Sequence, residues 1–139
     1  MSKDNQAEML RIETDIIAGM VGHAKRVAPV EACGYLAGKD GLVTRQYRLK
    51  NIDASEIHFS LDPREQFDAV RDMRERGLAL AAVYHSHPET PARPSAEDIK
   101  LALDPDISYV IVSLSDGVET VESFKINEDG VEKEELVSV

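Results

Sequence analysis

The sequence of 139 residues contains one cysteine, no tryptophan and no long apolar segment. The single cysteine, Cys33, excludes an internal disulfide framework and any metal cluster built from several thiolates. No stretch approaches the roughly 20 apolar residues that a membrane-spanning helix requires. The first seven residues are polar and no long apolar run follows them, so we expect no secretory signal peptide. These absences predict a soluble protein of the cytoplasm with no membrane partner.

Positive charge is also scarce, since 16 Lys and Arg residues stand against 26 Asp and Glu residues. The formal net charge of −10 argues against nucleic acid as a partner, because binding to a phosphate backbone needs clustered cations. Apolar residues make up 42% of the chain, which is enough for a packed core and argues against disorder. The length suits one domain, and no repeat or linker divides it. We therefore predict a single domain over residues 1–139, with residues 1–8 flexible.

The order of the expected elements indicates an α/β fold, in which a mixed β-sheet is flanked by helices in one layered domain. Apolar residues at helical spacing predict a first helix over residues 14–27, with Thr14 as its N-cap. Asp62 followed by Pro63 predicts the start of a second helix, because an acidic cap and a proline at the first position favour initiation. Gly77 predicts the end of that helix. A third, short helix is expected over residues 95–103, and strands over residues 9–12, 32–37, 42–49, 58–61, 78–84, 107–114, 118–126 and 131–139.

The segment with the clearest chemistry begins with two histidines, His85 and His87, directly after a continuous apolar run that predicts a buried strand. Side chains two residues apart on an extended chain point to the same side, so both imidazoles can reach one point. Asp98 is expected in the first turn of the next helix, where a loop returning past Pro91 and Pro94 can aim it at that point. Two imidazoles and one carboxylate suit Zn²⁺ and leave a fourth position open for a reactive water.

Each of these residues also has an ordinary structural interpretation. A single histidine at a strand end is more often a hydrogen-bonded structural residue than a ligand, and the pair alone does not decide between the two. Ser95 and Asp98 match a capping box, which needs nothing but a helix start. The two interpretations are compatible, because a capping serine can fix the helix that carries the aspartate. Glu31, taken alone, is an ordinary surface carboxylate.

Glu31, the two histidines, Ser95 and Asp98 together resemble the complete signature of the JAMM family, the MPN-type metalloprotease domain. In that signature a glutamate precedes His-x-His, which is followed by seven residues, a serine, two residues and an aspartate. Residues 29–38 resemble the first motif of the family, and residues 85–95 resemble the second. The signature runs from residue 31 to residue 98, so the resemblance covers most of the chain. Five functional positions with a fixed gap are far more specific than a lone dipeptide.

The resemblance implies that His85, His87 and Asp98 bind one zinc ion per chain. It also implies that Glu31 takes a proton from the zinc-bound water and passes it to the leaving amine. The hydroxyl of Ser95, by the same resemblance, helps to hold the developing oxyanion. No covalent intermediate is needed.

The family's typical substrates are ubiquitin or ubiquitin-like proteins, which are cut after their C-terminal Gly-Gly. The chain resembles the compact prokaryotic members, so the resemblance implies a peptidase or isopeptidase for the tail of a ubiquitin-like sulfur-carrier protein. The alternative is a catalytically silent MPN-type scaffold, although such scaffolds usually lack a metal ligand and the full set is present here. A zinc deaminase would need several cysteines. The carrier, the kind of bond cut, the leaving group and any homo-oligomer remain open.

Four other residues are expected to have structural roles. His23 is expected on a solvated or half-buried helix face, and His58 in a short strand. Ser86 is expected to point away from the metal and to form a local hydrogen bond. Cys33 is expected to be a buried, inert thiol rather than a nucleophile.

Overall fold

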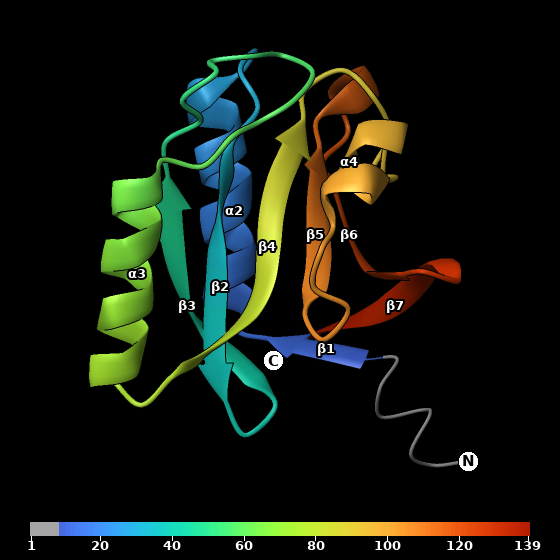
Figure 1. The fold of residues 1–139 in the computed structure, drawn as a ribbon. Helices are drawn as coiled ribbons and strands as arrows, with labels where there is room; N and C mark the ends of the chain where they lie inside the picture. The colour runs from blue at the N-terminus through green and yellow to red at the C-terminus, as the bar shows by residue number, and fades with distance from the viewer. Residues whose placement is uncertain (1–8) are drawn as a thin grey trace.

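A computed structural model describes residues 9–139, so the expected flexibility of residues 1–8 lies outside the described part of the chain (Figure 1). The strands are β1 (Met9–Ile12), β2 (Cys33–Lys39), β3 (Leu42–Leu49), β4 (Ala79–His87), β5 (Ser108–Ser113), β6 (Thr120–Asn127) and β7 (Gly130–Ser138). The helices are α2 (Thr14–Val27), α3 (Pro63–Glu75) and α4 (Ala96–Leu101), with a short 3-10 turn at Ser115–Gly117. Within residues 9–139, no helix is long and apolar enough to cross a membrane.

All of these strands belong to one mixed sheet, in the order β1-β3-β2-β4-β5-β6-β7. β2 runs antiparallel to both β3 and β4, whereas β4 and β5 are parallel. The predicted α/β class with a mixed sheet is therefore confirmed. The layered arrangement expected from the sequence did not include closure of the sheet, but the sheet is a closed barrel, because the short β1 pairs in parallel with both β3 and β7 and joins the two edges. Closure leaves no unpaired edge strand in this sheet.

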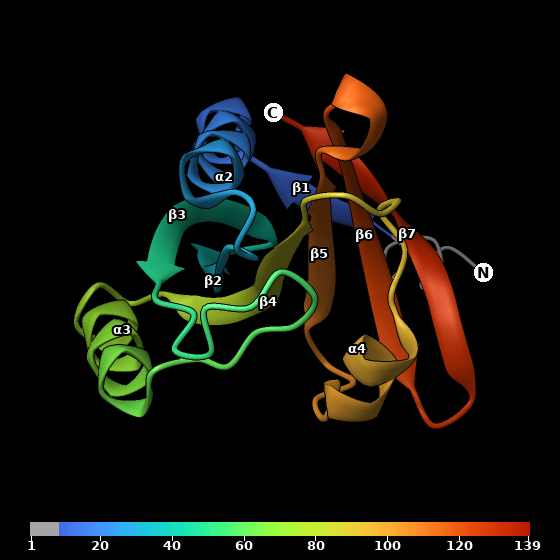
Figure 2. The same cartoon turned by 90° about the horizontal axis from the view of Figure 1, so that it is seen from above.

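Helices α2 and α3 cover opposite faces of the part of the sheet formed by β2, β3 and β4 (Figure 2). Met20 of α2 packs with Leu36 of β2 in the larger hydrophobic cluster. On the other face, Met73 of α3 packs with Tyr35, the neighbour of Leu36 in the same strand. Because β2 is covered on both sides, nearly all of its residues are buried rather than alternating in exposure.

The two predicted helix caps differ in outcome. Asp62 caps α3 as predicted, and its side chain accepts a hydrogen bond from the backbone N–H of Arg64 at 2.9 Å. The N-cap of α2 is Glu13 rather than Thr14. The Thr14 hydroxyl lies 2.6 Å from that of Ser138, so this side chain joins the helix start to β7 instead of capping the helix.

Residues 58–61, predicted as a strand, belong to the loop between β3 and α3. Only an isolated bridge between Leu61 and Asn51 remains of the expected pairing. His58 therefore lies in a loop, where its Nδ1 is 3.3 Å from a carboxylate oxygen of Asp53. The prediction was wrong because a short apolar stretch cannot distinguish a strand from a loop that packs over a cleft.

Cys33 is a fully buried thiol, as expected. Its Sγ lies 3.5 Å from the backbone oxygen of Leu49, to which the S–H group can donate. Burial raises the pKa of Cys33 to about 12, so the reactive thiolate is strongly disfavoured in the folded protein.

His23 is more buried than expected, with 7% of its surface exposed. Its Nδ1 lies 2.7 Å from the hydroxyl of Tyr84, and that hydroxyl also accepts a hydrogen bond from Gln46 at 3.0 Å. Tyr84 OH therefore links the Gln46 amide to the His23 ring. Burial, with a smaller contribution from nearby arginines, lowers the pKa of His23 to about 4. The network joins α2 and β3 to β4 next to His85.

We expect acid to destabilise the protein through His23. The group binds a proton at pH 6.5 when unfolded but near pH 4 when folded, so its stabilising effect is full above pH 6.5 and is lost below it. The loss amounts to roughly 2–3 kcal/mol between pH 7.5 and 4.5. The free energy of unfolding, measured with urea in the presence of a chelator, should therefore fall less steeply with decreasing pH in His23→Gln than in wild type. Parallel declines would contradict this role for His23.

Candidate metal centre

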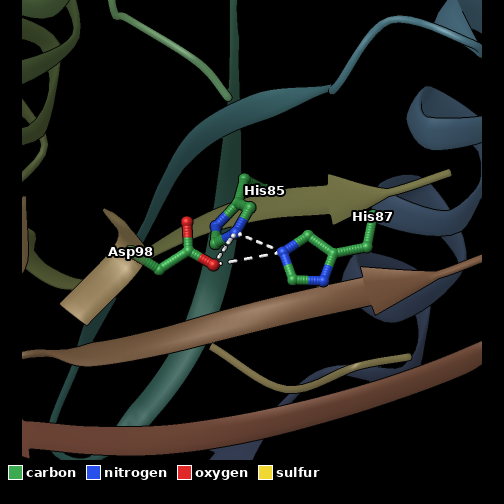
Figure 3. A group of neighbouring side chains, drawn as sticks. All are labelled: His85, His87 and Asp98. Atoms are coloured by element: carbon green, nitrogen blue, oxygen red, sulfur yellow. Dashed lines mark hydrogen bonds and ion pairs between the residues drawn. The ribbon is translucent and has the colours of Figure 1, made fainter. Parts of the chain in front are cut away.

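The carboxyl end of β4 and the start of α4 bring the three predicted metal ligands together (Figure 3). His85 and His87 project from the same side of β4, as the alternation of an extended strand requires. His85 Nε2 and His87 Nε2 lie 3.1 Å apart. Each nitrogen is also 3.1 Å from Oδ2 of Asp98, which approaches from the first turn of α4. The three donor atoms thus form a nearly equilateral triangle.

The spacing and chemistry of this triangle fit a zinc ion. Ligand atoms about 2.0–2.1 Å from zinc at tetrahedral angles lie about 3.3 Å from one another, close to the separations found here. Two imidazoles and one carboxylate are the kind of donor set that catalytic zinc sites use, with one position left for water. Among the His, Cys, Asp and Glu side chains of residues 9–139, His85, His87 and Asp98 form the group of three whose donor atoms lie close enough together to hold a metal ion.

Neighbouring groups hold both imidazole rings in place. The Nδ1–H of His87 donates to the backbone oxygen of Pro91 at 2.9 Å, which leaves Nε2 free to face the metal position. Phe59, from the loop between β3 and α3, stacks on the His85 ring with 4.7 Å between centroids. Both rings are about 95% buried. The site therefore needs little rearrangement to accept an ion.

The capping box predicted at the start of α4 also orients the Asp98 carboxylate. Ser95 Oγ accepts a hydrogen bond from the Asp98 N–H at 3.0 Å. In return, Asp98 Oδ2 accepts one from the Ser95 N–H at 2.9 Å. The structural and the metal-binding interpretations therefore hold together, because the same oxygen that caps the helix also faces both histidines.

The charges of the three side chains depend on one another. Burial raises the pKa of Asp98, but hydrogen bonds from the two histidines outweigh it and hold that pKa far below the usual range. Burial also lowers the pKa of His85, so this ring favours the neutral form that binds metal. At His87 burial acts in the same direction, but contacts with Asp98 and the Pro91 carbonyl outweigh it and raise the pKa.

Glu31 is not an ordinary surface carboxylate. It lies two residues before β2, and only 3% of its surface is exposed. Its Oε1 is buried and has no hydrogen-bond partner among the described residues. Burial raises the pKa of Glu31 to about 8, and the charges of His87 and Asp98 both act on it. A carboxyl group kept in this state beside a metal site is suited to accept and return a proton.

Asn51 organises the loop beside the metal centre and was not singled out from the sequence. Its side-chain amide donates to the backbone oxygens of Glu31 (3.1 Å) and His58 (3.0 Å). Its side-chain oxygen accepts from the N–H groups of Asp53 (3.1 Å) and Ser60 (3.2 Å). The one available signal was the Asn-x-Asp turn sequence after a strand, which is typical of many loops. One buried side chain thus ties the general-base candidate to the loop that crosses the end of β4 (Figure 1).

Ser86 points away from the predicted metal ligands, as expected, but its hydrogen bond is not local. Its Oγ accepts from the backbone N–H of Ala32 at 2.7 Å, across 54 positions of sequence. The Ser86 N–H also donates to the Ala32 oxygen at 2.9 Å. These bonds fix the residue next to Glu31 against the strand that carries both histidines.

Comparison with known proteins places this geometry in a family. The sequence profile described as "Prokaryotic homologs of the JAB domain" matches residues 13–127. A curated "CysO-cysteine peptidase" of Mycobacterium tuberculosis (strain ATCC 25618 / H37Rv) is 40% identical over 134 residues, covering 94% of this chain and 91% of its own. A "Probable TtuB-protein conjugate cleaving protease" of Thermus thermophilus is 41% identical over 97 residues, covering 69% and 64% of the two chains.

A solved structure supports the same assignment. The solution structure of a Desulfitobacterium hafniense protein superposes with a TM-score of 0.85 at 46% identity, covering 94% of this chain and 92% of that one. The family profile spans more than half of the chain and includes every residue of the site described above. The chain therefore belongs to the prokaryotic JAMM/MPN family and is a peptidase of the JAMM type.

Proposed function

We propose that this chain is a zinc-dependent peptidase or isopeptidase that cuts after the C-terminal Gly-Gly of a ubiquitin-like protein of the sulfur-carrier type. The observation that carries the proposal is the convergence of His85, His87 and Asp98, whose donor atoms lie 3.1 Å from one another. The unpaired, buried oxygen of Glu31 is a second support, because a general base needs a free lone pair in the cleft.

The residues of the site have different roles in the proposed hydrolysis. Zinc held by the two histidines and Asp98 would polarise the scissile carbonyl and acidify a water molecule. Glu31 takes the proton of the attacking water and returns it to the leaving nitrogen. The Ser95 oxygen already accepts a hydrogen bond from Asp98, so its own hydrogen is free to donate to the developing oxyanion.

The proposed substrate follows from the hollow beside the centre and from the relatives' names, which refer to CysO–cysteine and to TtuB–protein conjugates. The hollow measures about 370 Å³ and borders His85 and Asp98. Its walls include Phe59, Leu101 and Ile111, which suit the extended, apolar part of a carrier tail. Two glycines at the cleavage point can pass a narrow part of the cleft that larger side chains would block. The cytoplasm, where such carriers act, is the compartment that belongs to this proposal.

The alternative is a silent MPN-type scaffold that binds partners without hydrolysis. It explains neither the complete donor set nor the buried, unpaired oxygen of Glu31. An unpaired polar atom costs stability, so a scaffold gains nothing by keeping it.

A direct assay tests the proposed function. Zinc-loaded protein is incubated with ubiquitin-like carriers whose Gly-Gly tail is extended by one residue or joined to a lysine side chain. Mass spectrometry should show carriers trimmed to Gly-Gly, and a chelator should stop the reaction. Intact carriers of every kind, with zinc present at one ion per chain, would support the scaffold instead.

A further inference from the structure

A second hollow borders the metal centre, on the side of His87 and Ser95, and measures about 500 Å³. It is lined by His87, Thr90, Pro91, Arg93, Pro94 and Ser95. The hollow on the other side of the centre has no lysine or arginine among its described lining residues, but contains Glu97, Asp98 and Asp104. The two sides of the centre therefore differ in charge, with a cation on one side and carboxylates on the other.

The guanidinium of Arg93 is free to bind a ligand. Its side chain makes no hydrogen bond or ion pair within residues 9–139, although the chain as a whole carries ten excess negative charges. Arg93 also borders a neighbouring hollow that contains Asp116, Glu122 and Lys133, in which Lys133 Nζ lies 3.1 Å from Glu122 Oε2. An exposed arginine without a partner, beside a catalytic centre, suits recognition of an anion.

The loop that carries Arg93 is held directly by a metal ligand. The backbone oxygen of Pro91 accepts both the Arg93 N–H at 2.8 Å and the Nδ1–H of His87 at 2.9 Å. The hydroxyl of Ser113 in β5 donates to the Thr90 oxygen at 2.7 Å. Pro91 and Pro94 on either side restrict the backbone further. The backbone that carries Arg93 is therefore held close to the candidate metal centre.

We propose that Arg93 binds the α-carboxylate of a single amino acid that is released from the C-terminus of the carrier. The inference rests on the proposed peptidase activity. A carrier bound across the centre places its tail in the apolar hollow and its leaving group in the polar one. Hydrolysis of the Gly–amino acid bond yields the carrier's glycine carboxylate and a free amino acid, whose own carboxylate lies next to the bond that breaks. A lysine side chain in an isopeptide has only methylene groups there, which offer arginine no partner.

Two matched substrates test this role. A carrier ending in Gly-Gly-Ala is prepared as the free acid and as the alaninamide, which differ only in that carboxylate. The wild type should cleave the acid about tenfold faster in kcat/KM, and in Arg93→Gln the ratio of the two should fall to near one. The control Arg71→Gln, which removes an exposed arginine on α3, should keep the wild-type ratio. A ratio near one in the wild type, or an unchanged ratio in Arg93→Gln, would overturn the inference.

A binding measurement separates this inference from the activity itself. Zinc-loaded Glu31→Gln protein is titrated with L-alanine and with L-alaninamide, and the backbone amide signals of Thr90 and Ser95 are followed by NMR. Saturable chemical-shift changes with L-alanine but not with L-alaninamide support the site, even if no carrier is cleaved. These changes should disappear in the double variant that also contains Arg93→Gln. Equal responses to both probes, or none, would reject it.

Discussion

Glu31→Gln is expected to lower kcat by about 10²–10⁴-fold without reducing the zinc content of the protein. Glutamine has nearly the shape of glutamate, but its amide cannot take a proton from water and return it to the leaving amine. The buried, unpaired Oε1 of Glu31 is the atom that loses this ability. The rate is measured on an extended carrier by mass spectrometry, and zinc by elemental analysis of the same preparation.

A nearby carboxylate provides the control for this variant. Glu56 is exposed in the loop whose Ser55 oxygen accepts the backbone N–H of Glu31, so Glu56→Gln removes the same charge beside the same segment. It should retain wild-type kcat. If Glu31→Gln keeps more than about a tenth of the activity, the base is another group and the assignment is wrong.

Asp98→Asn is expected to abolish both zinc binding and hydrolysis, with activity reduced by more than about 10³-fold. The asparagine oxygen can still accept the Ser95 N–H and cap α4, so the helix should form normally. What is lost is the negative charge that lies 3.1 Å from both imidazoles, and an amide oxygen is a poor ligand for zinc. Zinc per chain and circular dichroism are measured together, so that metal loss can be separated from unfolding.

Glu89→Gln is the control for Asp98→Asn, because it also replaces a carboxylate by an amide and lies in the loop between His87 and Asp98. Glu89 is exposed and belongs to none of the contacts at the centre, so zinc content and activity should stay at wild-type values. Full zinc occupancy in Asp98→Asn would mean that the ion is held by other residues.

The convergence of His85, His87 and Asp98 could be predicted because their geometry depends on local structure. Alternation along one strand is enough to place His85 and His87 on the same side, and the structure keeps them there. The capping box fixes Asp98 within a single turn of helix. Each of these relations extends over a few residues, so the spacing of the sequence contains the necessary information.

The surroundings of the site could not be predicted because they depend on contacts between distant segments. The burial of Glu31 results from packing against β4 and from the loop that Asn51 holds across the cleft. Ser86 and Ala32 are 54 positions apart, and no periodic pattern relates them. Residue patterns alone therefore gave an ordinary surface carboxylate at Glu31, which only the family resemblance marked as a base, and a local hydrogen bond at Ser86.

Asp62, Pro63 and Gly77 identified the limits of α3, but tertiary packing decides which of its apolar residues are buried. Phe67 is 65% exposed and Val70 is 40% exposed, whereas Ala69 and Met73 are buried against the sheet. The aromatic ring of Phe67 instead lies beneath the guanidinium of Arg71. Barrel closure was missed for a related reason, because only the tertiary structure shows that β1 pairs through all four of its residues with β7 and through Arg11 and Ile12 with β3.

The most direct test of the account is to locate the metal. Crystals of zinc-replete wild-type protein should give a single strong anomalous peak at the zinc edge, within about 2.0–2.2 Å of His85 Nε2, His87 Nε2 and Asp98 Oδ2. The Glu31 carboxylate should face the remaining position. A zinc-replete protein without a peak between these three atoms, or with its zinc bound by other residues, would contradict the proposed mechanism.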